Sequence, residues 1–99
     1  MKVFISQPMR GKIDEEILNE RNQVIEKIKS QYEDVEIIDS YFEDYNPEDG
    51  NVALKYLSKS IELLADADLA VFIKDWGQNR GCRIEHLCCV NYGIDRKYL

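Results

Sequence analysis

Short apolar runs alternate with longer amphipathic segments along the chain, a pattern that predicts a sheet covered by helices. Three runs, Lys2–Ile5, Val35–Ile38 and Leu69–Ile73, have the length and the β-branched or aromatic content of strands. The last of them, LAVFI, has no polar position, which is typical of a strand covered on both faces. We expect it to be central in a parallel sheet.

Between and after these runs, apolar residues recur every three or four positions, as they do along one side of a helix. The first such segment runs from Asp14, its expected N-cap, to about Gln31, and the second from about Val52 to Ala65. The third covers 82–92 and stops at Gly93. The faces expected to pack are, in the second segment, Leu54, Leu57, Ile61 and Leu64 and, in the third, Ile84, Leu87, Cys88 and Asn91.

The order strand, helix, strand, helix, strand, helix is typical of a parallel sheet with right-handed crossovers. We therefore predict one α/β domain over residues 1–99, a small Rossmann-like or flavodoxin-like three-layer sandwich with a three- to four-stranded parallel sheet. The tail IDRKYL is compatible with a short edge strand or with a plain chain end. Ligands of such sheets bind at the carboxyl ends of the strands. The candidate loops are Ser6–Lys12, Asp39–Asn46 and Lys74–Gly81.

Composition narrows the classes of partner. The chain has 19 acidic and 13 basic residues, a net charge of −6, which disfavours a nucleic acid polymer as partner. No apolar run has the length of a membrane span and no signal peptide is apparent, so we expect a cytoplasmic protein without a membrane partner. A domain of 99 residues has little room to enclose a substrate. We therefore expect a homodimer or a higher homo-oligomer.

The three cysteines, Cys82, Cys88 and Cys89, are odd in number and fall in one predicted helix, which is no basis for a disulfide framework. We expect reduced structural thiols. Cys82 and His86 have the helical spacing of a metal-ligand pair, but the chain has no second Cys/His pair to complete a tetrahedral site. The sequence therefore predicts neither a metal nor a cofactor.

Cationic side chains are concentrated on two of the three candidate loops. Arg10 and Lys12 follow the first strand, and Arg80 and Arg83 lie near the start of the third helix. Together with the N–H groups of that helix start they predict an anion pocket, with a phosphate as the plainest ligand. The alternative is that they are ordinary surface residues. Neither GxGxxG nor GxxxxGKS/T occurs, which disfavours dinucleotides and P-loop chemistry.

Glu85 lies near the first turn of the third helix, where a carboxylate could face a ligand and act as nucleophile or general acid. The alternative is an acidic residue that only complements the helix dipole. Trp76, Tyr41, Phe42 and Tyr45 lie on the candidate loops. Such aromatic side chains could stack on a base or a sugar, or could cover a core edge or an oligomer interface.

Two segments of the chain resemble one known family. The opening, VFISQPMRG, is similar to the strand and ISGPM loop that begin the nucleoside 2-deoxyribosyltransferase-like proteins. The later stretch, ADADLAVFIKDWGQNRGCRIE, is similar to the second motif of that superfamily, with Asp68, Trp76, Gly81 and Glu85 in matching places. The resemblance spans nearly the whole chain. It is closest to a widespread short domain of the superfamily whose function is largely uncharacterised.

The resemblance implies chemistry at an N-glycosidic bond. Glu85 would be the nucleophile that attacks the anomeric carbon of a 2-deoxynucleoside or its 5′-monophosphate, after which water or a second base takes the deoxyribosyl group. The cluster of Arg10 and Arg80 favours a nucleotide over a plain nucleoside. The expected ligand-binding residues are Ser6, Gln7, Pro8, Met9, Arg10, Asp75, Trp76, Asn79, Arg80 and Gly81.

The chain departs from the family pattern around Glu85. Phe4 stands where the transferases commonly have a tyrosine, and Ser60 where an aspartate handles the base. Asn79 replaces Ser or Asp, and Gln7 replaces a small residue. Because a nucleophilic carboxylate depends on its neighbours, a non-catalytic nucleotide-binding or sensing module on the same scaffold is the alternative function. A purely structural or protein-interaction domain would not explain why the arginines converge with Glu85.

Overall fold

Four parallel strands form the sheet of the computed structural model, which describes residues 1–42 and 45–99. The predicted α/β class and parallel sheet are confirmed. Residues 43 and 44 of the expected loop lie outside the described residues. In chain order the elements are β1 (Lys2–Ser6), α1 (Asp14–Gln31), β2 (Glu36–Ile37), α2 (Val52–Leu64), β3 (Leu69–Phe72), the 3-10 helix η1 (Trp76–Gln78), α3 (Arg80–Tyr92) and β4 (Asp95–Tyr98).

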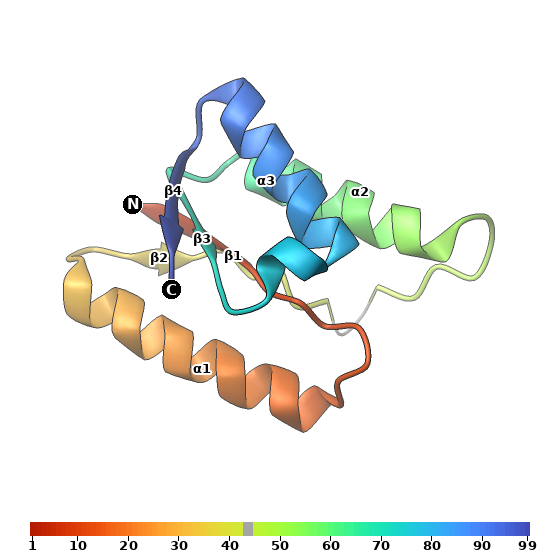
Figure 1. Cartoon of the computed structure of the whole chain (residues 1–99), viewed down its shortest axis with the longest axis horizontal. Helices are drawn as coiled ribbons and strands as arrows, with labels where there is room; N and C mark the ends of the chain where they lie inside the picture. The colour runs from red at the N-terminus through yellow and green to blue at the C-terminus, as the bar shows by residue number, and fades with distance from the viewer. Residues whose placement is uncertain (43–44) are drawn as a thin grey trace.

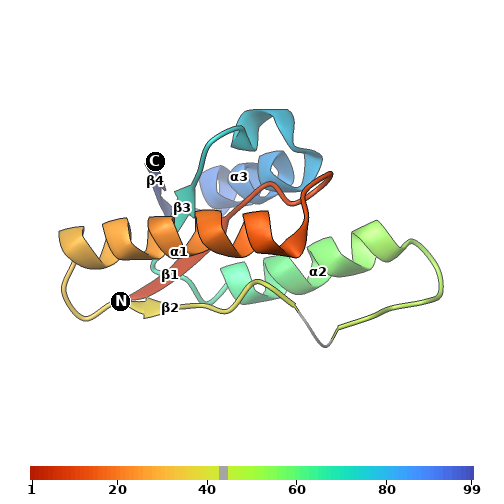
Figure 2. The same ribbon diagram turned by 90° about the horizontal axis from the view of Figure 1, so that it is seen from below.

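The strand order is β2-β1-β3-β4, so the order reverses between β1 and β3. Helix α1 connects β1 with β2 and lies on one face of the sheet, whereas α2 and α3 lie on the other (Figure 1). Figure 2, seen from below, shows α1 alone on the near side of the strands. The chain therefore has the predicted three layers, and its switch point lies between the two central strands.

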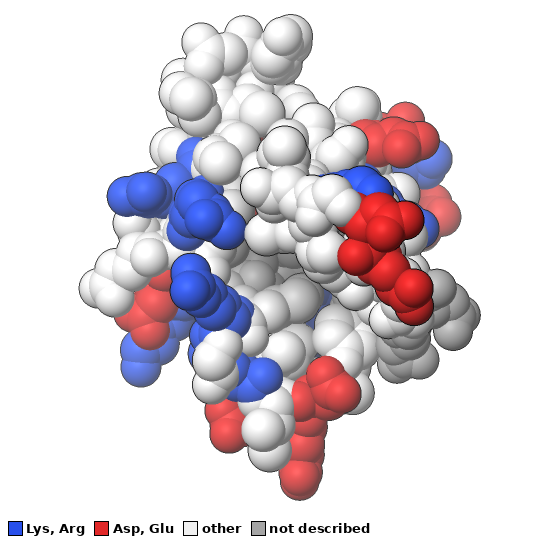
Figure 3. All heavy atoms as spheres, turned by 90° about the vertical axis from the view of Figure 1, so that its right-hand side faces the viewer, with Lys and Arg blue, Asp and Glu red and all other residues white. Residues whose placement is uncertain are grey.

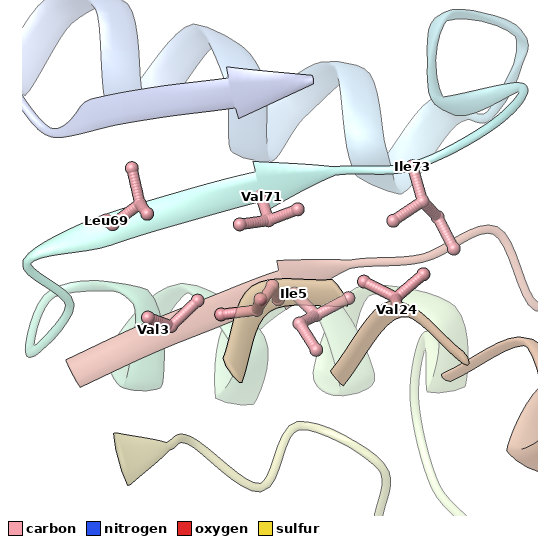
Figure 4. Close-up of a cluster of buried hydrophobic side chains, with 7 residues drawn as sticks. Val3, Ile5, Val24, Leu69, Val71 and Ile73 are labelled. Atoms are coloured by element: carbon pink, nitrogen blue, oxygen red, sulfur yellow. The ribbon is translucent and has the colours of Figure 1, made fainter. Parts of the chain in front are cut away.

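Successive residues of a strand point to opposite faces of a sheet, so β1 and β3 supply both cores. Figure 4 shows the core on the α1 side, where alternate strand residues meet the apolar stripe of α1. This core contains Val3, Ile5, Val24, Ile28, Leu69, Val71 and Ile73. The core on the α2 and α3 side contains Phe4, Leu64, Ala70, Phe72 and Cys89.

The starts of α1 and α3 differ from the prediction. The N-cap of α1 is Ile13, whose side chain makes no capping hydrogen bond, and Asp14 is the first helical residue. The Asp14 carboxylate instead accepts a hydrogen bond of 2.7 Å from the Tyr41 hydroxyl. Helix α3 begins earlier than expected because the Asn79 side chain accepts a hydrogen bond of 3.0 Å from the Cys82 N–H. An asparagine cap of this kind satisfies one of the free N–H groups of a helix start.

Helix α2 packs on the sheet only through its carboxyl-terminal half. Leu64 is buried and Ile61 is half-buried, but Leu54, expected on the same packed face, is 59% exposed. Figure 1 shows why, since the start of α2 extends past the strands. Ala53, Tyr56 and Leu57, in the first half of α2, line a cleft instead of packing on the sheet. None of the helices in the described part of the chain is long and apolar enough to cross a membrane.

Helix α3 is rotated relative to the prediction. Its buried residues are Cys82, Glu85 and Cys89, whereas Leu87, expected to pack, is 60% exposed. The two buried thiols and Glu85 follow one another at spacings of three and four residues on one side of α3, so Glu85 faces inward with them. After α3 the tail forms β4, which pairs in parallel with β3 at the edge of the sheet.

Candidate active site

A cleft of about 1050 Å³ lies beyond the carboxyl ends of β1 and β3, where the strand order reverses. It is lined by the loop after β1, the start of α1, the loop after β2, the first half of α2 and the segment from η1 into α3. Figure 3 looks onto this side of the molecule, which is hollowed near its centre. Lys and Arg side chains gather on one flank of the hollow.

Most of the predicted site residues border this cleft, and two do not. Ser6 is 1% exposed and lies behind the lining, and Trp76 packs elsewhere. Phe4 and Ser60 also line the cleft. The predicted residues that line it are Gln7, Pro8, Met9, Arg10, Asp75, Asn79, Arg80, Gly81 and Glu85.

Glu85 is the carboxyl group held inside the cleft wall. It is 7% exposed, and its Oε1 accepts a hydrogen bond of 2.7 Å from the Ser6 hydroxyl. Its Oε2 has no hydrogen-bond partner among the described residues, yet it is not among their fully buried unpaired atoms. One oxygen is therefore tied to β1, and the other is open toward the cleft that Glu85 lines.

The protonation of Glu85 is set mainly by burial. Removal from water disfavours the charged form and raises the pKa of Glu85 to about 7, although the hydrogen bond from Ser6 acts in the opposite direction. Burial likewise raises the pKa values of the Cys82 and Cys89 thiols to about 11. Near neutral pH both thiols are therefore uncharged, and Glu85 is partly protonated and partly ionised.

The cationic flank of the cleft consists of Arg10, Lys12, Arg80 and Arg83. Lys12 forms a salt bridge of 3.1 Å with Glu20, the only ion pair within the described residues. The three arginines therefore keep their charges available to a ligand. The start of α3 adds free N–H groups and the positive end of its dipole at the same place.

Gln7 connects the exit of β1 with α1. Its Nε2 donates to the Ile17 carbonyl at 2.8 Å and to Glu20 Oε1 at 3.1 Å, while its Oε1 is buried without a partner. The amide therefore braces the loop after β1 against the helix that follows.

A second buried polar contact, missed from the sequence, supports the other side of the cleft. Arg21 of α1 is 5% exposed and donates to the Ile38 carbonyl at 3.1 Å and to Ser40 Oγ at 3.2 Å. Ser40, which lines the cleft, donates in turn to the Ile5 carbonyl at 3.3 Å. Burial lowers the pKa of Arg21, and the nearby Asp39 opposes that change. In the sequence Arg21 lies four residues after Ile17 and three before Val24, so it falls on the apolar stripe of α1, and this charged position among apolar ones is the signal that could have identified it.

Comparison of the chain with protein-family models, curated proteins and solved structures finds no match. Within the described residues no group of three or more His, Cys, Asp or Glu side chains could hold a metal ion.

Trp76 does not line the cleft, contrary to the prediction. The chain turns at Asp75, whose φ of 68° lies in the left-handed region, and the Trp76 ring then stacks on His86 at 4.3 Å. It also packs against Phe72 and Tyr98, and the Tyr98 hydroxyl lies 2.6 Å from His86 Nε2. Trp76 is thus part of an aromatic cluster that joins η1, α3 and β4.

The aromatic wall of the cleft consists of Tyr41, Phe42 and Tyr56. The Phe42 and Tyr56 rings are stacked at 6.4 Å, and the Tyr56 hydroxyl donates to the Tyr45 carbonyl at 2.6 Å. Tyr45 itself does not line this cleft. Tyr56 was not predicted, because the whole of α2 was expected to pack on the sheet. The available signal was length, since α2 is longer than the strands on which it packs and part of it must extend beyond them.

The cleft therefore combines three chemical elements. One flank carries unpaired guanidinium groups, another carries aromatic rings, and a carboxyl group with one open oxygen lies in the wall. A ligand with an anionic group and a ring fits such a site. A carboxylate in this position can form a bond with an electrophilic carbon of that ligand.

Proposed function

We propose that the protein binds a 2-deoxynucleoside 5′-monophosphate in this cleft and cleaves or transfers at its N-glycosidic bond, with Glu85 as nucleophile. The observation that carries the proposal is the Glu85 carboxyl, buried in the cleft wall with Oε1 held at 2.7 Å by Ser6 and Oε2 open. The resemblance around Gly81 and Glu85 supports the same role.

In the first step Glu85 Oε2 bonds to the anomeric carbon as the bond from that carbon to the base breaks. The bonding electrons leave with the base, which takes a proton from water. In the second step water, or an N–H nitrogen of another base, attacks the anomeric carbon as the bond to Glu85 Oε2 breaks and the carboxylate is released. The proton that the attacking group loses neutralises the hydroxide left by the first step. A nearby carboxylate stabilises the positive charge that develops on the sugar in the transition state. Because each step inverts the anomeric carbon, the two steps together retain its configuration.

The cationic flank favours a nucleotide over a nucleoside. Arg10 lies in the loop after β1 and Arg80 is the first residue of α3, and both are free of ion pairs within the described residues. A guanidinium can bind phosphate oxygens in pairs, which fixes the orientation of the ligand as well as its affinity. The aromatic rings of Phe42 and Tyr56 offer a stacking surface for the base.

A single assay tests the catalytic proposal. The protein is incubated with each deoxynucleoside monophosphate, with and without a second free base, and the released base is separated by chromatography. We expect the wild type to release base, Glu85→Ala to release none above background, and Glu62→Gln, an exposed change on α2, to match the wild type. Equal release by the wild type and Glu85→Ala would exclude Glu85 as the nucleophile.

The alternative function is a non-catalytic nucleotide-binding or sensing module. The specific observation in its favour is Phe4, which borders the cleft without a polar group where the transferases commonly have a tyrosine. Calorimetric titration with the same monophosphates separates the two functions. Binding without base release supports the sensor, and base release supports the enzyme.

The compartment can be argued from the cysteines. All three, Cys82, Cys88 and Cys89, are free thiols on α3. Free thiols persist in reducing compartments. We infer that the protein acts in the cytoplasm, and cell fractionation with an antibody to the chain tests this location.

A further inference from the structure

We propose that Ser6 is the positioning residue of Glu85, and that its hydroxyl decides which carboxylate oxygen meets the ligand. This inference rests on the proposed function for its catalytic consequence. The contact itself was not expected from the sequence, which assigned Ser6 to the ligand pocket. In the structure Ser6 is 1% exposed and does not line the cleft.

The contact joins two rigid elements that are distant in the sequence. The Ser6 hydroxyl donates to Glu85 Oε1 at 2.7 Å across a separation of 79 residues. Ser6 ends β1 and is paired in register with Phe72 of β3, so its backbone is held by the centre of the sheet. A donor on such a support restricts the rotation of the carboxylate far more than a donor on a loop does.

Ser6 is the donor that β1 offers to this side of the sheet. Phe4 and Ser6 are two positions apart and share a face, on which Phe4 packs in the core with Leu64 and Cys89. Phe4 has no polar group, so it cannot hold the carboxylate. The hydroxyl that orients Glu85 therefore comes from the last residue of the strand, two positions beyond Phe4.

The hydrogen bond makes the two carboxylate oxygens unequal. Oε1 accepts from Ser6, whereas Oε2 has no partner among the described residues and is not fully buried. The atom that attacks the anomeric carbon is therefore Oε2. In the ester that forms, Oε1 becomes the carbonyl oxygen and can keep its bond to Ser6. The same donor then stabilises the carboxylate when it is released again.

Within the described residues no charged group takes over this role from Ser6. The titratable neighbours of Glu85 on α3 are Cys82 and Cys89, whose thiols have pKa values of about 11 and are neutral while Glu85 titrates. Lys12, across the cleft, acts on Cys82, and its ammonium is paired with Glu20. Burial disfavours the Glu85 carboxylate, and the hydrogen bond from Ser6 is the interaction that favours it.

The first test measures the carboxyl group directly and needs no turnover. Protein with carbon-13 in its glutamate side chains is titrated by NMR, and the Glu85 signal is assigned by its loss in Glu85→Gln. Because a hydrogen bond to a charged group contributes about 1.5–3 kcal/mol, we expect the Glu85 midpoint to rise by about 1 to 2 pH units in Ser6→Ala. Ser6→Thr, which keeps a hydroxyl, should stay near the wild type.

The matched control is Ser58→Ala, the same change at an exposed position of α2, which should leave the midpoint unchanged. If Ser6→Ala does not fold, Ser6→Cys keeps the volume but donates weakly, and its midpoint should move in the same direction. A Glu85 midpoint that is unchanged in folded Ser6→Ala or Ser6→Cys overturns the inference.

The second test is kinetic and separates this inference from the proposed function. In Ser6→Ala we expect kcat at pH 7 to fall at least about tenfold, with KM within about twofold, because the ligand does not contact Ser6. The acid limb of the pH profile should move upward with the NMR midpoint. A wild type that releases no base overturns the proposed function, whereas an unmoved midpoint overturns the role of Ser6 whether or not base is released.

Discussion

At the scale of single residues, Glu85 is held between two opposing influences. Its side chain is only 7% exposed, and this burial favours the neutral, protonated form. The hydrogen bond of 2.7 Å from Ser6 favours the charged carboxylate. The result is a pKa of about 7, at which a small change of surroundings alters the ionised fraction most. A carboxyl group in this state can serve as a nucleophile at neutral pH and still be responsive to ligand binding.

The first prediction is a pH dependence of base release. A nucleophile must be ionised, and the pKa of Glu85 is raised to about 7, so the rate should rise as the pH increases toward 7 and level off above it. Initial rates of base release, measured from about two pH units below this pKa to about two above it, check this pH dependence. A rate that falls over the same range would show that Glu85 acts as an acid instead.

The second prediction concerns the arginines of the cleft. Arg80→Ala removes a charge that has no ion pair in the described structure, so KM for a deoxynucleoside monophosphate should rise about tenfold or more. KM for the corresponding deoxynucleoside, if it is a substrate, should change little. Arg96→Ala on β4, which is outside the cleft lining, is the matched control. Equal losses for both substrates would place Arg80 away from the phosphate.

At the scale of elements, the position of Glu85 follows from how α3 begins. Asn79 caps α3 and Asn51 caps α2, in each case through a side-chain oxygen that accepts a backbone N–H at 3.0 Å. The cap of α3 lies in the cleft lining, and that of α2 does not. Glu85 lies on α3, so fraying of that helix start reaches the carboxyl group, whereas fraying of α2 does not.

The third prediction compares these two caps. Asn79→Ala and Asn51→Ala should each lower the free energy of unfolding by about 1 kcal/mol, measured in urea. Only Asn79→Ala should also lower kcat for base release, because it loosens the start of the helix that holds Glu85. Asn51→Ala loosens the start of the helix that holds Tyr56 and should act on KM alone. Similar kcat values in the two variants would show that the start of α3 does not contribute to the chemical step.

At the scale of the whole molecule, the buried carboxyl group of Glu85 lowers the free energy of unfolding at neutral and higher pH. The pKa of Glu85 is about 7 in the folded chain against 4.5 as its ordinary value. The folded state therefore binds more protons than the unfolded state between these values, and the free energy of unfolding falls as the pH rises through that window. Residues placed for function commonly have such a cost in stability.

The fourth prediction is that Glu85→Gln is more stable than the wild type at high pH. The difference in the free energy of unfolding should be about 3 kcal/mol at pH 8, decline as the pH falls below 7, and vanish near pH 4. Urea unfolding at several pH values measures it, and the exposed Glu62→Gln should show no such dependence. A difference that does not change with pH would show that Glu85 titrates alike in both states.

The pattern of apolar positions predicted the first three strands, the three helices, the α/β class and the parallel sheet, because periodicity is a local property of the chain. It left open whether the tail IDRKYL forms a strand, which the structure shows as β4. It also placed Arg10, Arg80 and Glu85 at one edge, since the exits of parallel strands share an edge. It was wrong about the face of α3, where Leu87 is exposed, because the angle of a helix about its axis depends on packing against the sheet.

The amino-acid sequence by itself determined which segments become strands and helices, and that polar and cationic loops follow β1 and β3. Only the tertiary structure decided that Ser6 holds Glu85, that Tyr56 joins the cleft and that Trp76 leaves it. These outcomes depend on the rotation of α3 and on how far α2 extends past the strands. Both are settled by close packing between elements that are distant in the sequence, which local periodicity does not encode.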